Sequence, residues 1–329
     1  MANLCYIYRE KEKNETSIEL VFDAVADEIS RKGHNVFKWY KPVSWKKTFR
    51  EIRQLRKAKY DLYHITGDVN YLWLFFPWKK TTMTVHDIGM YKNNRKTLKR
   101  RLFVFASFWL PSLFLKKISC VSSLTKKDLA GLLKVDARKL RVISNPVVLD
   151  MVPIPKGFDS KCPTILQIGT GWHKNLDTLI EAVRGLHCRL EIVGSPETDL
   201  IERMNEYGIE HHISNRLSNE EVVEKYRQCD ILYFVSRSEG FGLPILEAQS
   251  MGRVVITADT EPTCSVCGGG ALLCSPNDTM AVRNGIRRLI EDRQLRERLI
   301  KAGFDNVKRF DRSSIAEEYM TFYSSNFGI

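Results

Sequence analysis

The residues best suited to chemistry lie in one short stretch of the second half of the chain, from Ser238 to Glu247. An apolar run precedes this stretch, and Pro244 suits the first turn of a helix that begins there. Gly240 and Gly242 allow the backbone to come close to a ligand. The free N–H groups at the start of a helix favour an anion such as pyrophosphate. The stretch is therefore a candidate phosphate-binding turn.

Two carboxylates flank this turn. Glu247 lies about one helical turn further along and can accept hydrogen bonds from a ribose diol, whereas Glu239 precedes the helix and can meet the hydroxyl groups of a bound sugar. The alternative is structural, because glycine turns between a strand and a helix are common and either glutamate could be a surface residue. Two carboxylates spaced across one glycine-rich turn favour a binding site.

The segment from Glu239 to Glu247 reads Glu-Gly-Phe-Gly-Leu-Pro-x-x-Glu and resembles the E-x7-E motif of the retaining family 4 glycosyltransferases, which have the GT-B fold. Further motifs of that family have counterparts in the same order along nearly the whole chain. These are Thr84–Asp87, which resembles the family's strand-end His-Asp, then Val121–Lys126, Val142–Val147, and Gln167–Gly169 with His173–Leu176. One motif is moderate evidence, whereas five in the right order are strong evidence.

The resemblance implies a role for each matching residue. Lys174 would neutralise the diphosphate of the donor, Glu247 would hold its ribose, and Glu239 would hold its sugar and take part in catalysis. His86 would line the sugar pocket from the N-terminal domain as the second catalytic candidate; the alternative is a satisfied histidine at a strand end. The other implied donor-binding residues are Gly169, Gly171, His173, Arg237, Gly240, Phe241, Gly242 and Leu243.

The loop before Lys174 departs from the family pattern. Many relatives place an arginine shortly before this lysine, whereas Gly171, Trp172 and His173 stand there in this chain. A diphosphate needs positive charge because the leaving group gains negative charge as the glycosidic bond breaks. His173 and Arg237 are therefore the candidates to replace the missing arginine.

The resemblance also implies a mechanism. The sugar would be transferred with retention at its anomeric carbon and without a protein nucleophile, and a donor phosphate oxygen would assist the acceptor hydroxyl. The chain contains no D-x-D sequence to anchor a metal–diphosphate complex. We therefore expect no metal site and no cofactor beyond the nucleotide-sugar substrate, because Lys174 and helix N-termini supply the positive field.

Strand-like runs alternate with helix-like runs through both halves of the chain, which predicts parallel sheets covered on both faces. The expected strands are Leu4–Arg9, Val36–Tyr40, Leu62–Ile65, Thr81–Val85, Ile118–Val121 and Leu140–Ile143, then Thr164–Ile168, Arg189–Val193, Ile231–Val235 and Val254–Thr257. Four prolines in 145–163 indicate a linker. We expect an α/β protein of the GT-B type, with two doubly wound Rossmann-like domains facing a central cleft. The acceptor-side domain would span 1–147 plus a C-terminal helix at 313–329, and the donor-binding domain 148–312.

The net charge of +12 is carried by residues 1–150, since the rest of the chain is mildly acidic. Basic clusters at 45–59 and 92–101 lie near aromatic residues, which suits an anionic membrane surface. The apolar run 102–115 is too short to span a bilayer, so it is either a core helix or an interfacial one. A solvated basic face is the alternative to a membrane surface, and nucleic acid lacks any accompanying binding motif.

Eight scattered cysteines and the absence of a leader pattern after Met1 predict free thiols in a reducing cytoplasm. Cys264 and Cys267 have the spacing of a metal knuckle, but no second pair accompanies them, so we expect no zinc. The predicted protein is cytoplasmic and peripheral on the inner face of the membrane.

The predicted function is transfer of a hexose-type sugar from a nucleotide-diphosphate sugar to an acceptor such as a lipid-linked or polysaccharide intermediate. UDP- and GDP-sugars are the first candidates for the donor. Two alternatives remain open, a non-catalytic glycosyltransferase-like binding subunit and a nucleotide-sugar epimerase or hydrolase on the same fold. The identities of the base, the sugar, the acceptor and the linkage are set by the shape of the pocket, and no motif encodes them.

Overall fold

The computed structural model describes residues 1–10, 17–88 and 102–329, so the predicted basic cluster at 92–101 lies outside the described residues. The chain forms two compact units. Unit 1 comprises Met1–Val148 together with Phe310–Ile329, and unit 2 comprises Leu149–Arg309. The sequence analysis placed these two divisions after residues 147 and 312.

Unit 1 contains a six-stranded sheet in the order β2-β1-β3-β4-β5-β6, in which all neighbouring strands are parallel. Every residue of β3 and β4 is buried, as expected for a parallel sheet covered on both faces. The strands are β1 (Asn3–Tyr8), β2 (Asn35–Tyr40), β3 (Leu62–Ile65), β4 (Thr81–Val85), β5 (Ile118–Cys120) and β6 (Leu140–Val142). The helices are α1 (Ser17–Arg31), α2 (Trp45–Ala58), α5 (Leu110–Phe114), α6 (Ser123–Leu132) and α14 (Arg312–Phe327).

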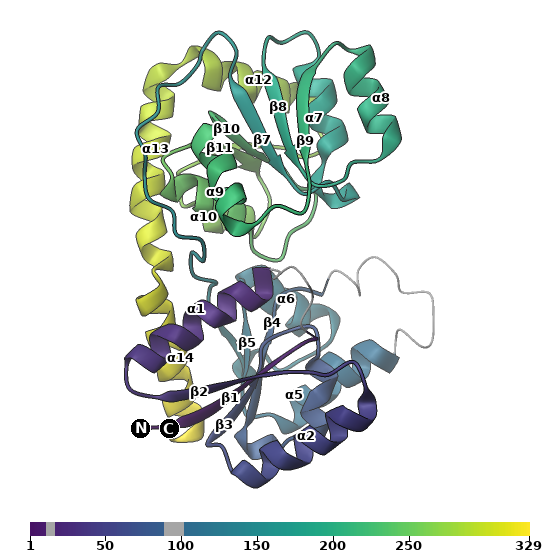
Figure 1. The fold of residues 1–329 in the computed structure, drawn as a ribbon, viewed down its shortest axis with the longest axis vertical. Coiled ribbons are helices and arrows are strands. Elements are labelled where there is room, and N and C mark those ends of the chain that lie inside the picture. The colour runs from purple at the N-terminus through teal and green to yellow at the C-terminus, as the bar shows by residue number, and fades with distance from the viewer. Residues whose placement is uncertain (11–16, 89–101) are drawn as a thin grey trace. The chain divides into compact units, whose positions relative to one another are not determined.

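The last helix, α14, packs along α1 in unit 1 (Figure 1). A buried polar chain joins α14 to the sheet. The Tyr323 hydroxyl lies 2.5 Å from Nδ1 of His64 and 2.8 Å from the Tyr6 hydroxyl, and Nε2 of His64 lies 2.8 Å from Oγ1 of Thr84. Burial lowers the pKa of His64 to about 3, so the ring is neutral and both of its nitrogens are hydrogen-bonded. These contacts fix the register of α14 on the sheet.

The apolar run 102–115 forms a helix whose middle, Phe105–Trp109, is wound as a π-helix. Val104 and Leu115 are buried in the core of unit 1, whereas a second set of apolar side chains faces solvent. That exposed set is Leu102, Phe103, Phe105, Leu113 and Phe114. One face of the run therefore packs in the core and the other face is exposed. None of the helices within the described residues is long and apolar enough to cross a membrane.

Unit 2 contains a second six-stranded parallel sheet, in the order β12-β11-β10-β7-β8-β9. Its strands are β7 (Thr164–Ile168), β8 (Arg189–Val193), β9 (Glu210–Ser214), β10 (Ile231–Phe234), β11 (Val254–Ala258) and β12 (Leu272–Cys274). Its helices are α7 (Leu176–Val183), α8 (Thr198–Glu206), α9 (Asn219–Gln228), α10 (Leu243–Ser250), α11 (Thr263–Cys267), α12 (Thr279–Glu291) and α13 (Arg293–Val307). Both sheets confirm the predicted α/β architecture.

The order of the strands in unit 2 creates a switch point beside β7. The chain moves from β7 to β8 on one side, and β10 later pairs with β7 on the other side. In open parallel sheets, ligands bind outside the carboxyl ends of the strands at such a point. The loops that follow β7 and β10 are therefore the ones positioned to form a site.

Candidate functional site

The loop after β7 begins with a glycine that leaves room for the side chain of Lys174. Gly169 follows β7 directly and has φ +85°, a conformation that side chains rarely adopt. A Cβ at this position would lie 3.1 Å from both Cγ and Cε of Lys174. The missing side chain thus lets Lys174 lie across the end of β7, in front of β10.

Lys174 and Glu239, two of the predicted site residues, are brought together at this edge. Nζ of Lys174 donates a hydrogen bond of 2.7 Å to Oε1 of Glu239, and the two side chains are 19% and 12% exposed. The same Nζ lies 4.8 Å from the ring centroid of Phe234, the last residue of β10. The ammonium group is therefore held by one carboxylate and one aromatic face. A cation adjacent to a carboxylate suits a ligand that carries both phosphate and hydroxyl groups.

Arg237 fastens the phosphate loop to the loop that carries Glu239. Its backbone N–H donates to the carbonyl of His173 at 2.8 Å, and its Nη1 donates to the carbonyl of Trp172 at 3.0 Å. The guanidinium also forms a two-point pair with Asp177 at the start of α7, at 3.0 and 2.7 Å. Burial acts to raise the pKa of Asp177, but the Arg237 hydrogen bonds and charge bring it below its ordinary value. Both Nη groups and the backbone N–H of Arg237 are therefore engaged in holding the two loops together.

The rest of the phosphate loop is exposed. Gly171 and His173 lie at the surface, and Trp172 between them is 69% exposed. The Arg237 guanidinium lies 5.4 Å from the Trp172 ring centroid and covers the ring on that side. The sequence analysis named Gly171 and His173 as donor-binding residues but gave Trp172 no role, although an exposed tryptophan beside a candidate phosphate loop is an unusual feature.

The glycine turn of the predicted motif leads into α10 as expected. Its two glycines differ in backbone conformation. Gly242 is the N-cap residue with φ +114°, and a Cβ there would lie 3.2 Å from Cδ1 of Ile245. Gly240 has no positive φ. Phe241 and Leu243 are buried and anchor the turn to the core. Glu239 therefore stands shortly before the start of α10 in the chain, where the first N–H groups of the helix carry partial positive charge.

Glu247 is buried inside unit 2. Its Oε2 accepts a hydrogen bond of 2.6 Å from the hydroxyl of Tyr226, and burial raises its pKa to about 7 against the opposing effect of that bond. Tyr226 is carried by α9, whose start is closed by a capping box between Ser218 and Glu221. Oε1 of Glu247 has no hydrogen-bond partner among the described residues, so it can accept one from a ligand. The sequence analysis missed Tyr226, because 21 residues separate it from its partner.

His86 belongs to unit 1 and follows β4. Its Nε2 lies 2.7 Å from the carbonyl oxygen of Thr66, so Nε2 carries the proton and donates it. Burial lowers the pKa of the ring, although the Thr66 bond opposes the shift. Gly67 has no side chain and makes room, because a Cβ there would lie 2.7 Å from Cδ2 of His86. His86 is therefore a neutral imidazole whose Nδ1 keeps an acceptor lone pair.

Within the described residues, no group of three or more His, Cys, Asp or Glu side chains is arranged to hold a metal ion. Cys264 and Cys267 lie on α11 as free thiols, and burial raises the pKa of both. Cys267 is buried and Cys264 is half-buried, so both side chains pack within unit 2.

Two family models match the chain. The model described as "Glycosyl transferases group 1" matches residues 154–305, and the one described as "Glycosyltransferase Family 4" matches residues 12–151. The chain belongs to these glycosyltransferases. The first match covers the whole site assembled in unit 2, from Gly169 to Glu247.

Curated relatives of this family are distant in sequence. An N,N'-diacetylbacillosaminyl-diphospho-undecaprenol alpha-1,3-N-acetylgalactosaminyltransferase of Campylobacter jejuni is 26% identical over 172 residues, covering 50% of this chain and 45% of the relative. The O-antigen chain mannosyltransferase RfbU of Salmonella typhimurium is 24% identical over 251 residues, covering 73% of this chain and 70% of the relative. The chain matches less than half the length of the first curated relatives, at 45%, 40% and 38%.

Solved structures confirm the GT-B fold. The Anabaena protein Alr3699/HepE, in complex with UDP and glucose, has a TM-score of 0.75 at 16% identity, covering 99% of this chain and 100% of that chain. Sucrose-phosphate synthase of Thermosynechococcus elongatus has a TM-score of 0.77 at 18% identity, with full coverage of both chains. At these identities the likeness establishes the fold of the chain and no more.

The Arg237–Asp177 pair predicts how the phosphate loop is kept in order. Arg237→Lys removes the two-point fork, so we expect the amides of Lys174 and Asn175 to exchange hydrogen about tenfold faster, equivalent to about 1.4 kcal/mol of local opening. Asp177→Asn should have a similar effect. Mass spectrometry of hydrogen exchange measures the change, with Arg189→Lys in an exposed pair as the matched control. Equal exchange in all of these variants would remove Arg237 from its positioning role.

Proposed function

We propose that this protein is a retaining hexosyltransferase that uses a nucleotide-diphosphate sugar, with UDP- or GDP-sugars as the first candidates. The acceptor we propose is a glycan or lipid-linked intermediate. The observation that carries the proposal is the Lys174–Glu239 pair, held at the carboxyl ends of β7 and β10 beside the start of α10. The names of the relatives support it, since they include transferases of lipid-linked and O-antigen sugars.

The donor is proposed to break the ion pair between Lys174 and Glu239 when it binds. Lys174 turns to the diphosphate, which also meets the first N–H groups of α10, and the released Glu239 accepts hydrogen bonds from the sugar hydroxyls. Glu247 offers Oε1 to the ribose, while the Tyr226 hydrogen bond holds its other oxygen in place. Because burial raises the pKa of Glu247 to about 7, this acceptor role is strongest above neutral pH.

The chemical step is proposed to run without a protein nucleophile. Lys174 and the α10 N-terminus stabilise the negative charge that the diphosphate gains as the bond to the anomeric carbon breaks. Glu239 holds the sugar while positive charge develops on its ring. A phosphate oxygen accepts the proton of the acceptor hydroxyl, which attacks the same face and so retains the configuration. No metal or cofactor is included, since Lys174 and the helix terminus already supply positive charge.

His86 is proposed as the residue of unit 1 that takes part in binding the sugar. Its fixed tautomer leaves Nδ1 as an acceptor, because Nε2–H is committed to the Thr66 carbonyl. A neutral acceptor of this kind suits a sugar hydroxyl. Arg237 is proposed to act through the loop it positions, because its guanidinium is already paired with Asp177.

Turnover with defined substrates tests the proposal. We expect UDP- or GDP-sugars to yield an acceptor-dependent product whose new bond has the donor's anomeric configuration, as read by NMR, in buffer that contains a chelator. Glu239→Gln should lower kcat/KM by about a hundredfold, since it weakens contacts to the transition state. Glu224→Gln, an exposed residue on α9, is the matched control.

Each other outcome of this assay would indicate a different function. Sugar release that needs no acceptor indicates a hydrolase, and an altered free nucleotide sugar indicates an epimerase. Nucleotide binding without turnover indicates a non-catalytic subunit. A product with inverted configuration would contradict the proposed mechanism while leaving transfer itself intact.

The exposed aromatic and basic surface of unit 1 leads us to propose that an anionic membrane is its partner. Trp45 and Phe49 of α2 pack against Phe75, and Tyr71 reaches Phe103, so the surface is continuous across three segments. Four cations of α2 border it, and they are Arg50, Arg53, Arg56 and Lys57. Aromatic side chains between cations match the headgroup layer of an anionic bilayer.

Vesicle sedimentation tests this surface. We expect binding to vesicles that contain phosphatidylglycerol and much weaker binding to phosphatidylcholine alone. The double variant Arg53→Gln/Arg56→Gln should bind about thirtyfold more weakly, at about 1 kcal/mol for each cation. The pair Arg287→Gln/Arg298→Gln, which removes two exposed cations from unit 2, serves as the control. Equal binding to both lipids, or no effect of the α2 variant, would contradict the proposal.

A further inference from the structure

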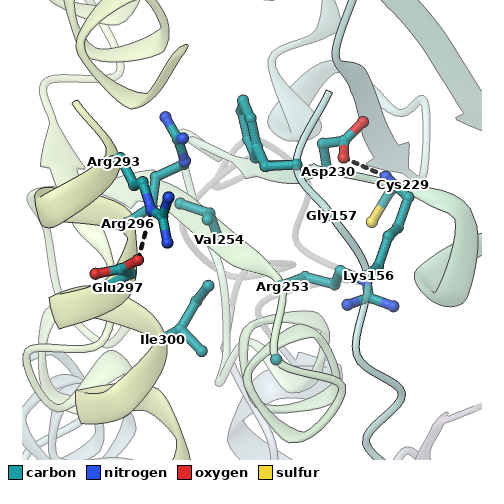
Figure 2. A pocket seen from close by; sticks show the side chains of 12 residues that line it. Lys156, Gly157, Cys229, Asp230, Arg253, Val254, Arg293, Arg296, Glu297 and Ile300 are labelled. Atoms are coloured by element: carbon teal, nitrogen blue, oxygen red, sulfur yellow. Dashed lines mark hydrogen bonds and ion pairs between the residues drawn. The ribbon is translucent and has the colours of Figure 1, made fainter. Parts of the chain in front are cut away.

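A pocket lies on unit 2, at the opposite edge of the sheet from Lys174 and Glu239. It has a volume of about 430 Å³ and is found where β10 and β11 begin (Figure 2). Asp230 and Arg253 precede those two strands. Because the strands are parallel, their starts and their ends form opposite edges of the sheet. The pocket is therefore separate from the proposed donor site.

The other walls of the pocket come from the two segments that connect the units. Lys156–Phe158 belong to the stretch that follows the first division, after Val148. Residues 293–300 belong to α13, which leads to the second division, after Arg309. In Figure 2 the α13 side chains face Lys156 and Asp230 across the pocket. A ligand here would contact both connecting segments at once.

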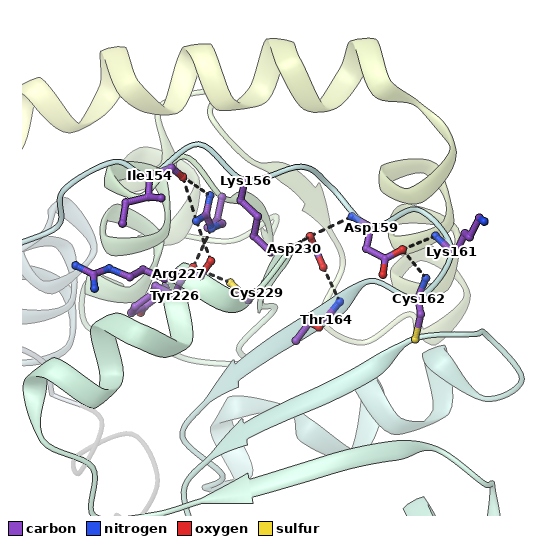
Figure 3. A network of polar contacts seen from close by, with 11 residues as sticks. Ile154, Lys156, Asp159, Lys161, Cys162, Thr164, Tyr226, Arg227, Cys229 and Asp230 are labelled. Atoms are coloured by element: carbon purple, nitrogen blue, oxygen red, sulfur yellow. Dashed lines mark hydrogen bonds and ion pairs between the residues drawn. The ribbon is translucent and has the colours of Figure 1, made fainter.

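Asp230, a buried acidic residue that lines the pocket, already has hydrogen-bond donors within the protein. Asp230 is buried and accepts hydrogen bonds from the Lys156 ammonium and from the backbone N–H groups of Asp159 and Thr164, at 3.3 and 2.9 Å for the two amides (Figure 3). These contacts tie the connecting segment to the sheet. They also leave the charge of Lys156 balanced by Asp230, so neither residue sets the net charge of the pocket.

Arg253 brings positive charge without a carboxylate partner. Arg253 is buried, with 5% of the residue exposed, and its guanidinium donates to the backbone carbonyls of Ile154, Tyr226 and Arg227, at 2.9 to 3.3 Å. Carbonyl groups satisfy the N–H groups but leave the unit charge uncompensated. Burial accordingly lowers the pKa of Arg253, with Asp230 opposing the shift at longer range.

Arg296 is a second cation of the pocket, and some of its N–H groups are not used in hydrogen bonds to the described residues. Its Nη1 donates to the carbonyls of Leu289 and Ile290, both at 2.8 Å, and its guanidinium lies 4.0 Å from the ring centroid of Phe158. Nε and Nη2 have no hydrogen-bond partner among the described residues. Arg293 stands one helical turn away, where its Nε pairs with Glu297 in an exposed ion pair.

We propose that this pocket binds a compact phosphate-bearing metabolite of about the size of a sugar phosphate. The forked guanidinium groups of Arg293 and Arg296 match the oxygens of a phosphate group. Phe158, Val254 and Ile300 form an apolar wall for the rest of the molecule. The buried charge of Arg253 favours the anion from behind without needing direct contact.

Calorimetry with inorganic pyrophosphate tests the pocket, using the Lys174→Ala protein so that the proposed donor site is weakened. We expect one pyrophosphate to bind to this variant, and Arg293→Gln/Arg296→Gln to reduce the affinity at least about tenfold by removing two charge-assisted contacts. Arg298→Gln, an exposed cation on the same helix, should change nothing. Pyrophosphate should also slow hydrogen exchange in 154–159.

The outcomes separate this pocket from the donor site. Loss of all pyrophosphate binding in Lys174→Ala would overturn the proposal, as would equal affinity in the Arg293→Gln/Arg296→Gln variant. Should that double variant unfold, Arg293→Gln alone decides the matter, because its side chain is 82% exposed and about threefold weaker binding is expected. Failure of sugar transfer would not affect the result.

Discussion

The site in unit 2 depends on a single ion pair between two loops that follow neighbouring strands. Lys174 reaches Glu239 across the end of β7, where Gly169 has no side chain to crowd the lysine. The pair is largely shielded from water, at 19% and 12% exposure, so its two charges must remain compensated. A ligand that separates them must offer an anion to the lysine and hydroxyl groups to the glutamate. A nucleotide sugar offers both.

Two further contacts stabilise the segments around this pair. Arg237 joins the phosphate loop to α7 through Asp177, and Tyr226 fixes one oxygen of Glu247. Neither contact touches the proposed reacting groups, yet each limits how far a loop can move. Such outer contacts are what hold a binding geometry within the tolerance that catalysis needs. Replacing the residues that make these contacts should therefore increase the mobility of the loops more than it slows the proposed reaction.

Much of this arrangement could be predicted from the sequence. The central strands were predicted because they are continuous apolar runs, and the turn before α10 because Gly242 and Pro244 mark a helix start. The edge strands β9 and β12 were missed. β9 reads Glu-His-His-Ile-Ser and lacks an apolar run, and β12 has only three residues. An edge strand pairs on one side alone and needs less burial, so its pattern is weak.

Contacts between distant residues could not be predicted. The sequence analysis offered Arg237 as a substitute for the missing phosphate-loop arginine, whereas its guanidinium is paired with Asp177, 60 residues earlier. The run 102–115 was expected to be either a core helix or an interfacial one; one face is buried in the core of unit 1 and the other is exposed, and whether the exposed face meets a membrane stays a prediction. Spacing along the chain determines which face a residue occupies, but only tertiary packing decides what that face meets.

Thermal unfolding with UDP, GDP, ADP, CMP and dTDP, each at millimolar concentration, tests the central claim most directly. At pH 8, above the raised pKa of Glu247, its carboxylate is ionised and able to accept from a ribose. We expect one nucleotide to raise the melting temperature, since a ligand at about a hundredfold above its Kd stabilises by about 2.7 kcal/mol. Glu247→Ala should fold and lose most of this shift. No shift with any nucleotide, or an equal shift in Glu247→Ala, would contradict the site described for unit 2.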